Sequence, residues 1–156
     1  MSRFSQLPTV FRFFAGGDNS VRGFAYNDLS PTEAVCTQDP TTKQFLRNPD
    51  GSCRSIAGYI KIGGKNVITG TVEVIRDLPK NLGIATFLDY GNAFDRFGTR
   101  LQYSVGVGVR VRLPVLTLGV DIAQPLSSSL RWEVNQQRFL SVRPGPRLHI
   151  NFSPKL

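Results

Sequence analysis

Few side chains in this sequence have the types and spacings that carry out catalysis. The only histidine, His149, has no nucleophile or carboxylate at a fixed spacing, so we interpret it as a polar residue of a strand rather than a catalytic base. Cys36 and Cys53 lack the paired short spacing of zinc ligands. Gly63-Gly64-Lys65 does not continue as a phosphate-binding loop. The sequence therefore predicts a protein that is not an enzyme and that holds no metal or cofactor.

One turn carries an arginine in an unusual setting. Gly16 and Gly17, followed by Asp18 and Asn19, allow a sharp reversal of the backbone before the run Val21-Arg22-Gly23-Phe24. Gly23 would let the backbone beside Arg22 approach another surface closely. The plain alternative is a surface turn that happens to contain an arginine.

Five stretches of the chain alternate apolar and polar residues with a period of two. In residues 101–113 every odd position is apolar, whereas the even positions include Arg110 and Arg112. Successive side chains of a strand point to opposite faces, so each stretch predicts a strand with one apolar and one polar face. The predicted strands cover residues 68–76, 84–94, 101–113, 115–125 and 146–153.

Two environments fit such strands. Transmembrane barrels have lipid on one side and water on the other, but an ordinary antiparallel sheet with one solvated face gives the same alternation. The connections favour the membrane, because the turns at Pro79 and Pro114 are short and those at 92–100 and 127–146 are long, as in outer-membrane barrels. Five strands cannot close, and an open sheet in lipid leaves backbone groups unpaired at both edges, so we expect part of a barrel.

Composition bounds the remaining classes. The 156 residues, with 15 Gly and 10 Pro, fit one domain rich in strands and turns. No run approaches the roughly 18 apolar residues of a membrane helix, and the first residues do not resemble a signal peptide. The net charge of +8 comes from Lys and Arg scattered over turns and polar faces, without interleaved aromatic residues, so we expect no nucleic-acid partner.

The turn and the strands together resemble the BamA/TamA family of outer-membrane assembly barrels. Val21-Arg22-Gly23-Phe24 is similar to the family's Val/Ile-Arg-Gly-Phe/Tyr motif, at the tip of an extracellular loop that folds back into the barrel lumen. The resemblance covers nearly the whole chain and is closest to TamA, in residues 13–17 and 153–156. Further matches follow in the family's order at 68–73, 87–94, 106–110, 118–126 and 148–156.

The resemblance implies an all-β, antiparallel transmembrane barrel in the bacterial outer membrane. Residues 1–156 would be its C-terminal part, with a long lumen-folding extracellular loop at 16–65 and the last five strands at 66–156. The last strand would carry the assembly signal in Leu148, Ile150 and Phe152. Two features depart from the family: the insertion between Asn27 and Lys65 is long, and the chain ends in Leu156 rather than an aromatic residue.

The function implied by the resemblance is the insertion or translocation of other proteins, without covalent catalysis. The first and last barrel strands would separate and offer clients an edge for β-augmentation. The implied partners are outer-membrane lipids, client outer-membrane or secreted proteins, and an inner-membrane or periplasmic protein. The alternatives are a two-partner-secretion pore, which shares the loop motif, and a soluble β-sandwich that binds a ligand or partner.

Within a barrel of this kind we expect Arg22 to reach a carboxylate on the inner wall. Asp89 is the first choice, and Glu73 and Asp121 are the alternatives, because the period-two count puts all three on the polar face. A planar guanidinium can bind a carboxylate through two parallel hydrogen bonds. Since a lumen is wet, we expect the pair to contribute only about 1 kcal/mol or somewhat more in isolation.

The two cysteines would both lie in the extracellular loop. That location is oxidising, so a disulfide between Cys36 and Cys53 is expected. The alternative is two free or intermolecular thiols.

Overall fold

The computed structural model describes residues 11–133 and 138–154, and this part is all β and antiparallel. One sheet has five strands in the order β3-β4-β5-β6-β9, and two separate hairpins pair β1 with β2 and β7 with β8. The strands of the sheet are β3 (Asn66–Leu78), β4 (Leu82–Phe94), β5 (Gln102–Arg112), β6 (Leu116–Pro125) and β9 (Arg147–Pro154). The hairpin strands are β1 (Thr32–Cys36), β2 (Ile56–Lys61), β7 (Ser129–Glu133) and β8 (Arg138–Val142).

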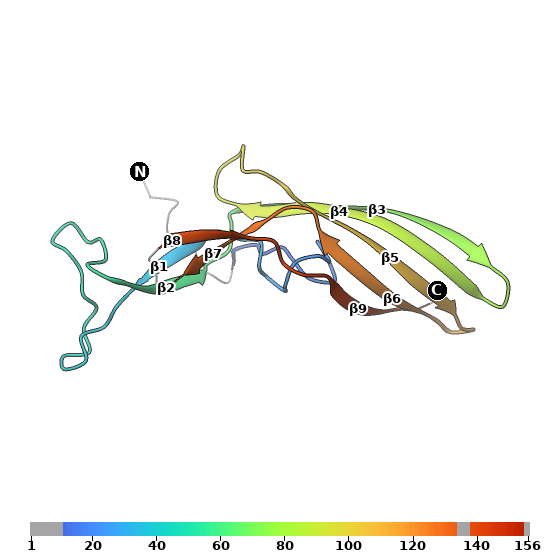
Figure 1. The fold of residues 1–156 in the computed structure, drawn as a ribbon, viewed down its shortest axis with the longest axis horizontal. Helices are drawn as coiled ribbons and strands as arrows, with labels where there is room; N and C mark the ends of the chain where they lie inside the picture. Colours follow the sequence, from blue (N-terminus) through green and yellow to red (C-terminus); the bar gives the residue numbers. More distant parts are fainter. Residues whose placement is uncertain (1–10, 134–137, 155–156) are drawn as a thin grey trace.

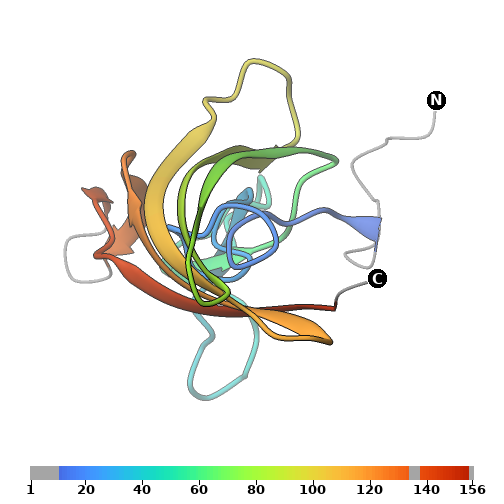
Figure 2. The same ribbon diagram turned by 90° about the vertical axis from the view of Figure 1, so that its right-hand side faces the viewer.

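The five-stranded sheet is curved into a trough that surrounds an earlier part of the chain. Figure 2 shows the strands curling around the blue segment that leads into the β1–β2 hairpin. Within the described residues the sheet does not close on itself, and β3 and β9 lie at its two edges.

The two faces of the sheet differ as the period-two pattern predicts, with the apolar face outside. Along β5, Val105, Val107 and Val109 are exposed, whereas the residues between them are buried. Val107 keeps 56% of its surface exposed and no second sheet in the described part covers it. A soluble sandwich buries its apolar faces between two sheets, so this arrangement is that of a sheet whose outer face meets lipid.

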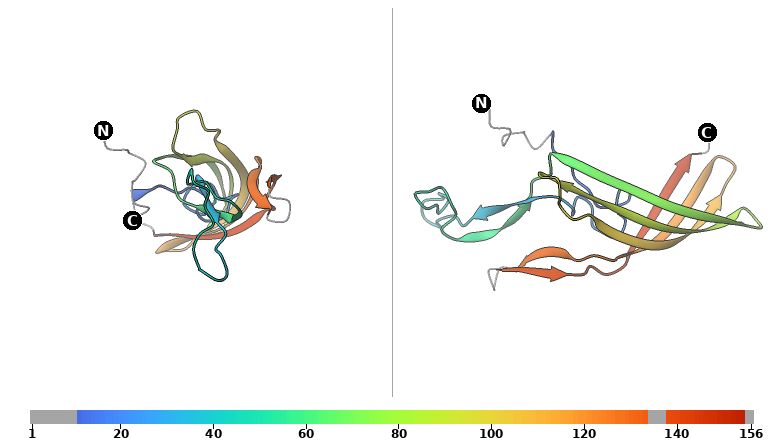
Figure 3. Two further views of the ribbon diagram at one scale, coloured as in Figure 1. Left: turned by 90° about the vertical axis from the view of Figure 1, so that its left-hand side faces the viewer. Right: turned by 90° about the horizontal axis from the view of Figure 1, so that it is seen from above.

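The connections are sorted by length between the two ends of the strands. Figures 1 and 3 show the β3–β4 and β5–β6 turns at one end and the two hairpins at the other. In the β3–β4 turn, Lys80 and Asn81 adopt φ of 65° and 60°, values that match the twist of a tight antiparallel hairpin. The short and long connections are therefore placed as the sequence predicted.

The structure adds two hairpins that the sequence analysis did not predict. The segment at 16–65, expected as one irregular loop, contains β1 and β2, and the connection after β6 contains β7 and β8. The residues of β1, β2 and β8 do not alternate strictly between apolar and polar, so they lack the period-two pattern. Ser129–Glu133 does alternate, over only five residues. The sequence of residues 1–15 also suggests the end of a strand that enters a loop, and residues 1–10 of this segment lie outside the described part.

The apolar core is small and lies inside the trough. It consists of Ala15, Val21, Phe24, Leu29 and Ala93. Four of these residues come from the segment before β1, so the core fixes that segment against the inner face of β4.

Candidate functional site

Residues 16–24, here called the loop tip, fold into a compact turn. Gly16 and Gly17 adopt φ of 104° and 97°, a region that favours glycine. The amide of Gly17 donates to the carbonyl oxygens of Val21 and Phe24. Val21 and Phe24 are completely buried, so the side chain between them, Arg22, is directed from a fixed backbone.

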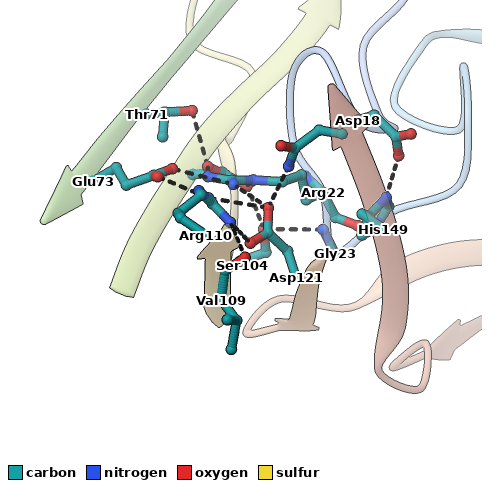
Figure 4. A network of polar contacts seen from close by, with 12 residues as sticks. Asp18, Arg22, Gly23, Thr71, Glu73, Ser104, Val109, Arg110, Asp121 and His149 are labelled. Carbon is teal, nitrogen blue, oxygen red and sulfur yellow. Dashed lines mark hydrogen bonds and ion pairs between the residues drawn. The ribbon is translucent and has the colours of Figure 1, made fainter. Parts of the chain in front are cut away.

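The Arg22 side chain binds three carboxylates from three strands (Figure 4). Its Nε and Nη2 donate to the two oxygens of Asp89 on β4, each at 2.9 Å. Its Nη1 donates to Asp121 on β6 at 3.0 Å and to Glu73 on β3 at 3.3 Å. The backbone N–H of Arg22 also donates to Asp89 at 3.0 Å. The first choice of partner and both alternatives from the sequence are thus all in contact with Arg22.

A second arginine completes the group. Arg110 on β5 donates to Glu73 at 2.7 Å and also binds Asp121. Arg22, Arg110, Glu73, Asp89 and Asp121 are here called the ion cluster, in which two cations face three carboxylates. Burial opposes the charge of Arg22, but hydrogen bonds and Coulombic attraction from Asp89 and Asp121 outweigh it and raise the pKa of Arg22. The arginine is therefore held in its charged form.

The aromatic ring of Phe87 packs against the Arg22 guanidinium. The Cζ atom lies 3.3 Å from the centroid of the Phe87 ring, close enough for a cation–π interaction. The ring itself fits because its neighbour on β5 is Gly106, where an added Cβ would lie 2.1 Å from Phe87. A glycine in the middle of this strand thus makes room for the ring on which Arg22 rests.

Gly23 brings the loop backbone against β5. Its N–H donates to the Ser104 hydroxyl at 3.1 Å. A Cβ at this position would lie 2.5 Å from the Ser104 Cβ and 3.0 Å from the Pro125 nitrogen. Only glycine allows this approach without displacing the loop tip or the wall.

His149 joins the loop tip to β9, at one edge of the sheet. Its Nδ1 contacts the Asp18 carboxylate and its Nε2 lies 2.6 Å from the carbonyl oxygen of Arg22. The loop tip consequently contacts every strand of the sheet, through Glu73, Asp89, Ser104, Asp121 and His149.

Burial corrects one expectation about the energetics of this site. A wet lumen was expected to weaken the Arg22 pair, but Arg22 is only 7% exposed and Asp89 and Asp121 are completely buried. Removing one member of a buried ion pair leaves a charge without compensation and typically costs about 3–5 kcal/mol. The loop tip, by filling the trough, buries Asp89 and Asp121, whereas the Glu73 side chain stays 24% exposed.

The other sequence-predicted residues lie away from the ion cluster. Cys36 and Cys53 form a disulfide that closes part of the connection between β1 and β2. Leu148, Ile150 and Phe152 are exposed on the outer face of β9. Three further residues of the site, Ser104, Arg110 and Phe87, were not predicted from the sequence. The parity of their positions places them on the polar face of their strands, and that signal could have identified them.

Other kinds of site are not found in the described residues. Residues 11–133 and 138–154 contain no group of three or more His, Cys, Asp or Glu side chains arranged to hold a metal ion. In the same residues there is no helix that is long and apolar enough to cross a membrane.

The sheet has an apolar outer face, and the ion cluster holds a loop that is folded against its inner face. These are features of the membrane β-barrel class of proteins. Residues 2–140 match the model of the Omp85 superfamily domain, and the chain belongs to this superfamily. It is 28% identical over 140 residues to the outer membrane protein assembly factor BamA of Nitratidesulfovibrio vulgaris. The matched region covers 85% of this chain and 15% of that relative. These similarities place the chain in the bacterial outer membrane.

Proposed function

We propose that this chain forms the last five strands and the lumen-folding loop of an outer-membrane barrel that inserts or translocates other proteins. The observation that supports it best is the ion cluster, in which Arg22 of the loop tip binds carboxylates of three strands. Such a cluster holds the strands in one register around the loop without offering a nucleophile or a base to a substrate. Its role is to fix the shape of the barrel wall, so the protein would act without covalent catalysis.

The remaining parts of the proposal follow from this placement. The end of the sheet that carries the β1–β2 and β7–β8 hairpins would face the cell exterior. The end with the short β3–β4 and β5–β6 turns would face the periplasm. β9 would be one side of a seam that opens toward lipid and pairs with client strands. Clients would be outer-membrane or secreted proteins, with an inner-membrane or periplasmic partner. Residues 13–17 and 153–156 are the basis for proposing a TamA-like member of the group, although the relative from Nitratidesulfovibrio vulgaris is a BamA.

Replacing Arg22 tests the proposal in the full-length gene product. Arg22→Ala leaves Asp89 without its cation, so we expect a strong loss of client assembly in cells that depend on the protein. Arg22→Lys should restore only part of the activity, because an ammonium cannot donate to both Asp89 oxygens in the planar geometry of a guanidinium. The measurement is the amount of folded client in the outer membrane, with the folded level of each variant measured alongside.

The double variant Arg22→Ala/Asp89→Asn serves as an internal control. It removes the cation together with the carboxylate that would be left unpaired, so we expect its folded level to exceed that of Arg22→Ala alone. Arg47→Ala is the matched control for charge, because Arg47 is exposed and donates to the carbonyl oxygen of Gly51 in the connection between β1 and β2. Normal client assembly with Arg22→Ala would contradict the proposal, and loss of one secreted protein alone would indicate a dedicated secretion pore.

A further inference from the structure

The two hairpins at one end of the sheet border a hollow of about 660 Å³, and Figure 3 shows both hairpins at that end. The ring centroids of Tyr59 on β2 and Phe139 on β8 lie 4.7 Å apart, so the hairpins touch each other there. Val142 of β8 and Gly58 of β2 also line the hollow, and no atom lies within 4 Å of a Cβ added at Gly58. The hollow therefore has an aromatic and apolar wall with free space beside it.

The hollow carries a surplus of positive charge. Its charged lining residues are Asp28, Lys61, Arg143 and Arg147. Lys61 binds Asp28 at 3.4 Å, so these two charges compensate each other. Arg143 and Arg147 are exposed, and neither side chain has an ion-pair or hydrogen-bond partner in the part of the chain that the structure describes. Two guanidinium groups are consequently left to bind an anion.

The backbone holds both arginines in place. Arg143 directly follows β8, and Arg147 is the first residue of β9. Pro144 and Pro146 stand between them and restrict φ. Gln124 on β6 donates from Nε2 to the Pro144 carbonyl oxygen at 3.4 Å. Little backbone entropy is therefore lost in this connection when an anion binds.

The hollow lies on the inner side of the sheet and not on its lipid side. Arg147 precedes His149 by two positions and so shares the inner face of β9, whereas Leu148 is on the outer face. In the ladder Arg147 lies opposite Ala123, which is completely buried. A ligand would thus reach the hollow from water or from the trough, which favours a soluble ligand over a membrane lipid.

We propose that this hollow binds an extended acidic segment of a client polypeptide. The inference rests on the proposed function, in which clients are inserted or exported, and it names the chemistry of the segment that the exterior end receives. A carboxylate can accept two parallel hydrogen bonds from one guanidinium, and an apolar side chain of the segment would pack beside Tyr59 and Phe139. Each hairpin is a two-stranded sheet with free strand edges in the described part, to which an extended segment can add by backbone hydrogen bonds.

Fluorescence anisotropy tests this inference with the full-length gene product in an uncharged detergent. The probe is an octapeptide of alternating Glu and Leu that carries an uncharged dye. We expect saturable binding that weakens as salt screens the charges. The same peptide with Gln in place of Glu should bind at least about tenfold more weakly, because it loses the hydrogen bonds between charged groups.

Substitutions of the two arginines test the assignment of the charge. Arg143→Gln and Arg147→Gln should each weaken binding of the Glu peptide about tenfold. Arg54→Gln is the matched control, because Arg54 is exposed and lies outside the hollow, and it should bind like the parent. Arg147→Glu should bind a peptide with Lys in place of Glu more tightly than the parent does, since the charges are then exchanged.

A substitution that fills the hollow separates it from a general effect of charge. Gly58→Leu places its side chain in open space, so the variant should fold and bind the Glu peptide at least about tenfold more weakly. Ala57→Leu is the control of equal size, because Ala57 is exposed and lies on the opposite face of β2. Its binding should equal that of the parent.

Several results would overturn the inference. Equal binding of the Glu and Gln peptides, or equal binding by the parent and Arg143→Gln/Arg147→Gln, would show that the arginines do not select an acidic chain. Displacement of the peptide by an equal concentration of inorganic phosphate would indicate a site for free anions, and displacement by phosphatidylglycerol would indicate a lipid site. Peptide binding does not report client assembly, so normal assembly with Arg22→Ala would overturn the proposed function and leave the binding result standing.

Discussion

Arg22 makes four side-chain hydrogen bonds, and their geometry explains why an arginine stands at this position. Nε and Nη2 are fixed in one plane and meet both oxygens of Asp89, while Nη1 serves Glu73 and Asp121. A planar guanidinium offers five N–H donors in a rigid fork, whereas a lysine offers one rotating point charge. One residue of the loop can therefore fix three strands of the wall in register.

Gly23 is the residue whose substitution tests the fit between loop and wall. In Gly23→Ala the new Cβ would lie 2.5 Å from the Ser104 Cβ, so the loop tip must shift and lose part of the Arg22 contacts. We expect destabilisation of about 1–3 kcal/mol, typical of overpacking in a close-packed site, measured by chemical unfolding of the full-length gene product in detergent. Gly58→Ala is the control, because no atom lies within 4 Å of an added Cβ there, and an equal effect of the two variants would refute the close approach.

At the scale of the strands, the period-two pattern predicted the sheet and the faces of its side chains. Asp89 and Asp121 could be placed on the inner face because parity along a strand is a local property. The contact between His149 and the loop tip could not be predicted, since it joins residues 127 positions apart. The complete burial of Asp89 and Asp121 was also missed, because it depends on how closely the loop tip fills the trough.

The exposed apolar face of β5 makes a prediction that depends on depth in the bilayer. Val107 lies near the middle of the strand and is 56% exposed, so Val107→Arg should destabilise the folded protein in lipid by about 2–4 kcal/mol. Tyr103 lies near the end of the same strand, and Tyr103→Arg should cost only about 0–1 kcal/mol. The measurement is the free energy of unfolding in lipid vesicles. Equal effects at the two positions would argue against a membrane-spanning β5.

The disulfide belongs to the β1–β2 hairpin and should stabilise that hairpin alone. Closing a loop of this size contributes about 3 kcal/mol in the chain-entropy model, so Cys36→Ser/Cys53→Ser should raise hydrogen exchange in β1 and β2. The loop tip and the five-stranded sheet should keep their protection, because the disulfide starts in β1, which belongs to a separate two-stranded sheet. The intact protein should weigh two hydrogens less than its reduced form, and complete alkylation without reductant would contradict the bridge.

For the whole molecule, the described part is a trough filled by a loop (Figure 2), and the trough has an apolar outer face and a polar inner face. A protein in water normally buries its largest apolar surfaces, but here Val72, Val107 and Ile122 all stay more than half exposed. The buried residues of the sheet instead include Asp89, Ser104 and Asp121. This inversion is explained by lipid outside, and the ion cluster then supplies the interior with the specific contacts that an apolar core supplies in soluble proteins.

The same inversion predicts how residues 1–156 behave when produced alone. The apolar outer face would meet water, and β3 and β9 would each leave a row of backbone donors and acceptors unpaired in the described sheet. We therefore expect the isolated chain to aggregate or to pair edge to edge in aqueous buffer, and to become dispersed in detergent micelles that cover the outer face. Static light scattering with and without detergent measures this directly. A monodisperse monomer in detergent-free buffer, together with cooperative unfolding, would show that the outer face does not need lipid and would overturn the membrane assignment.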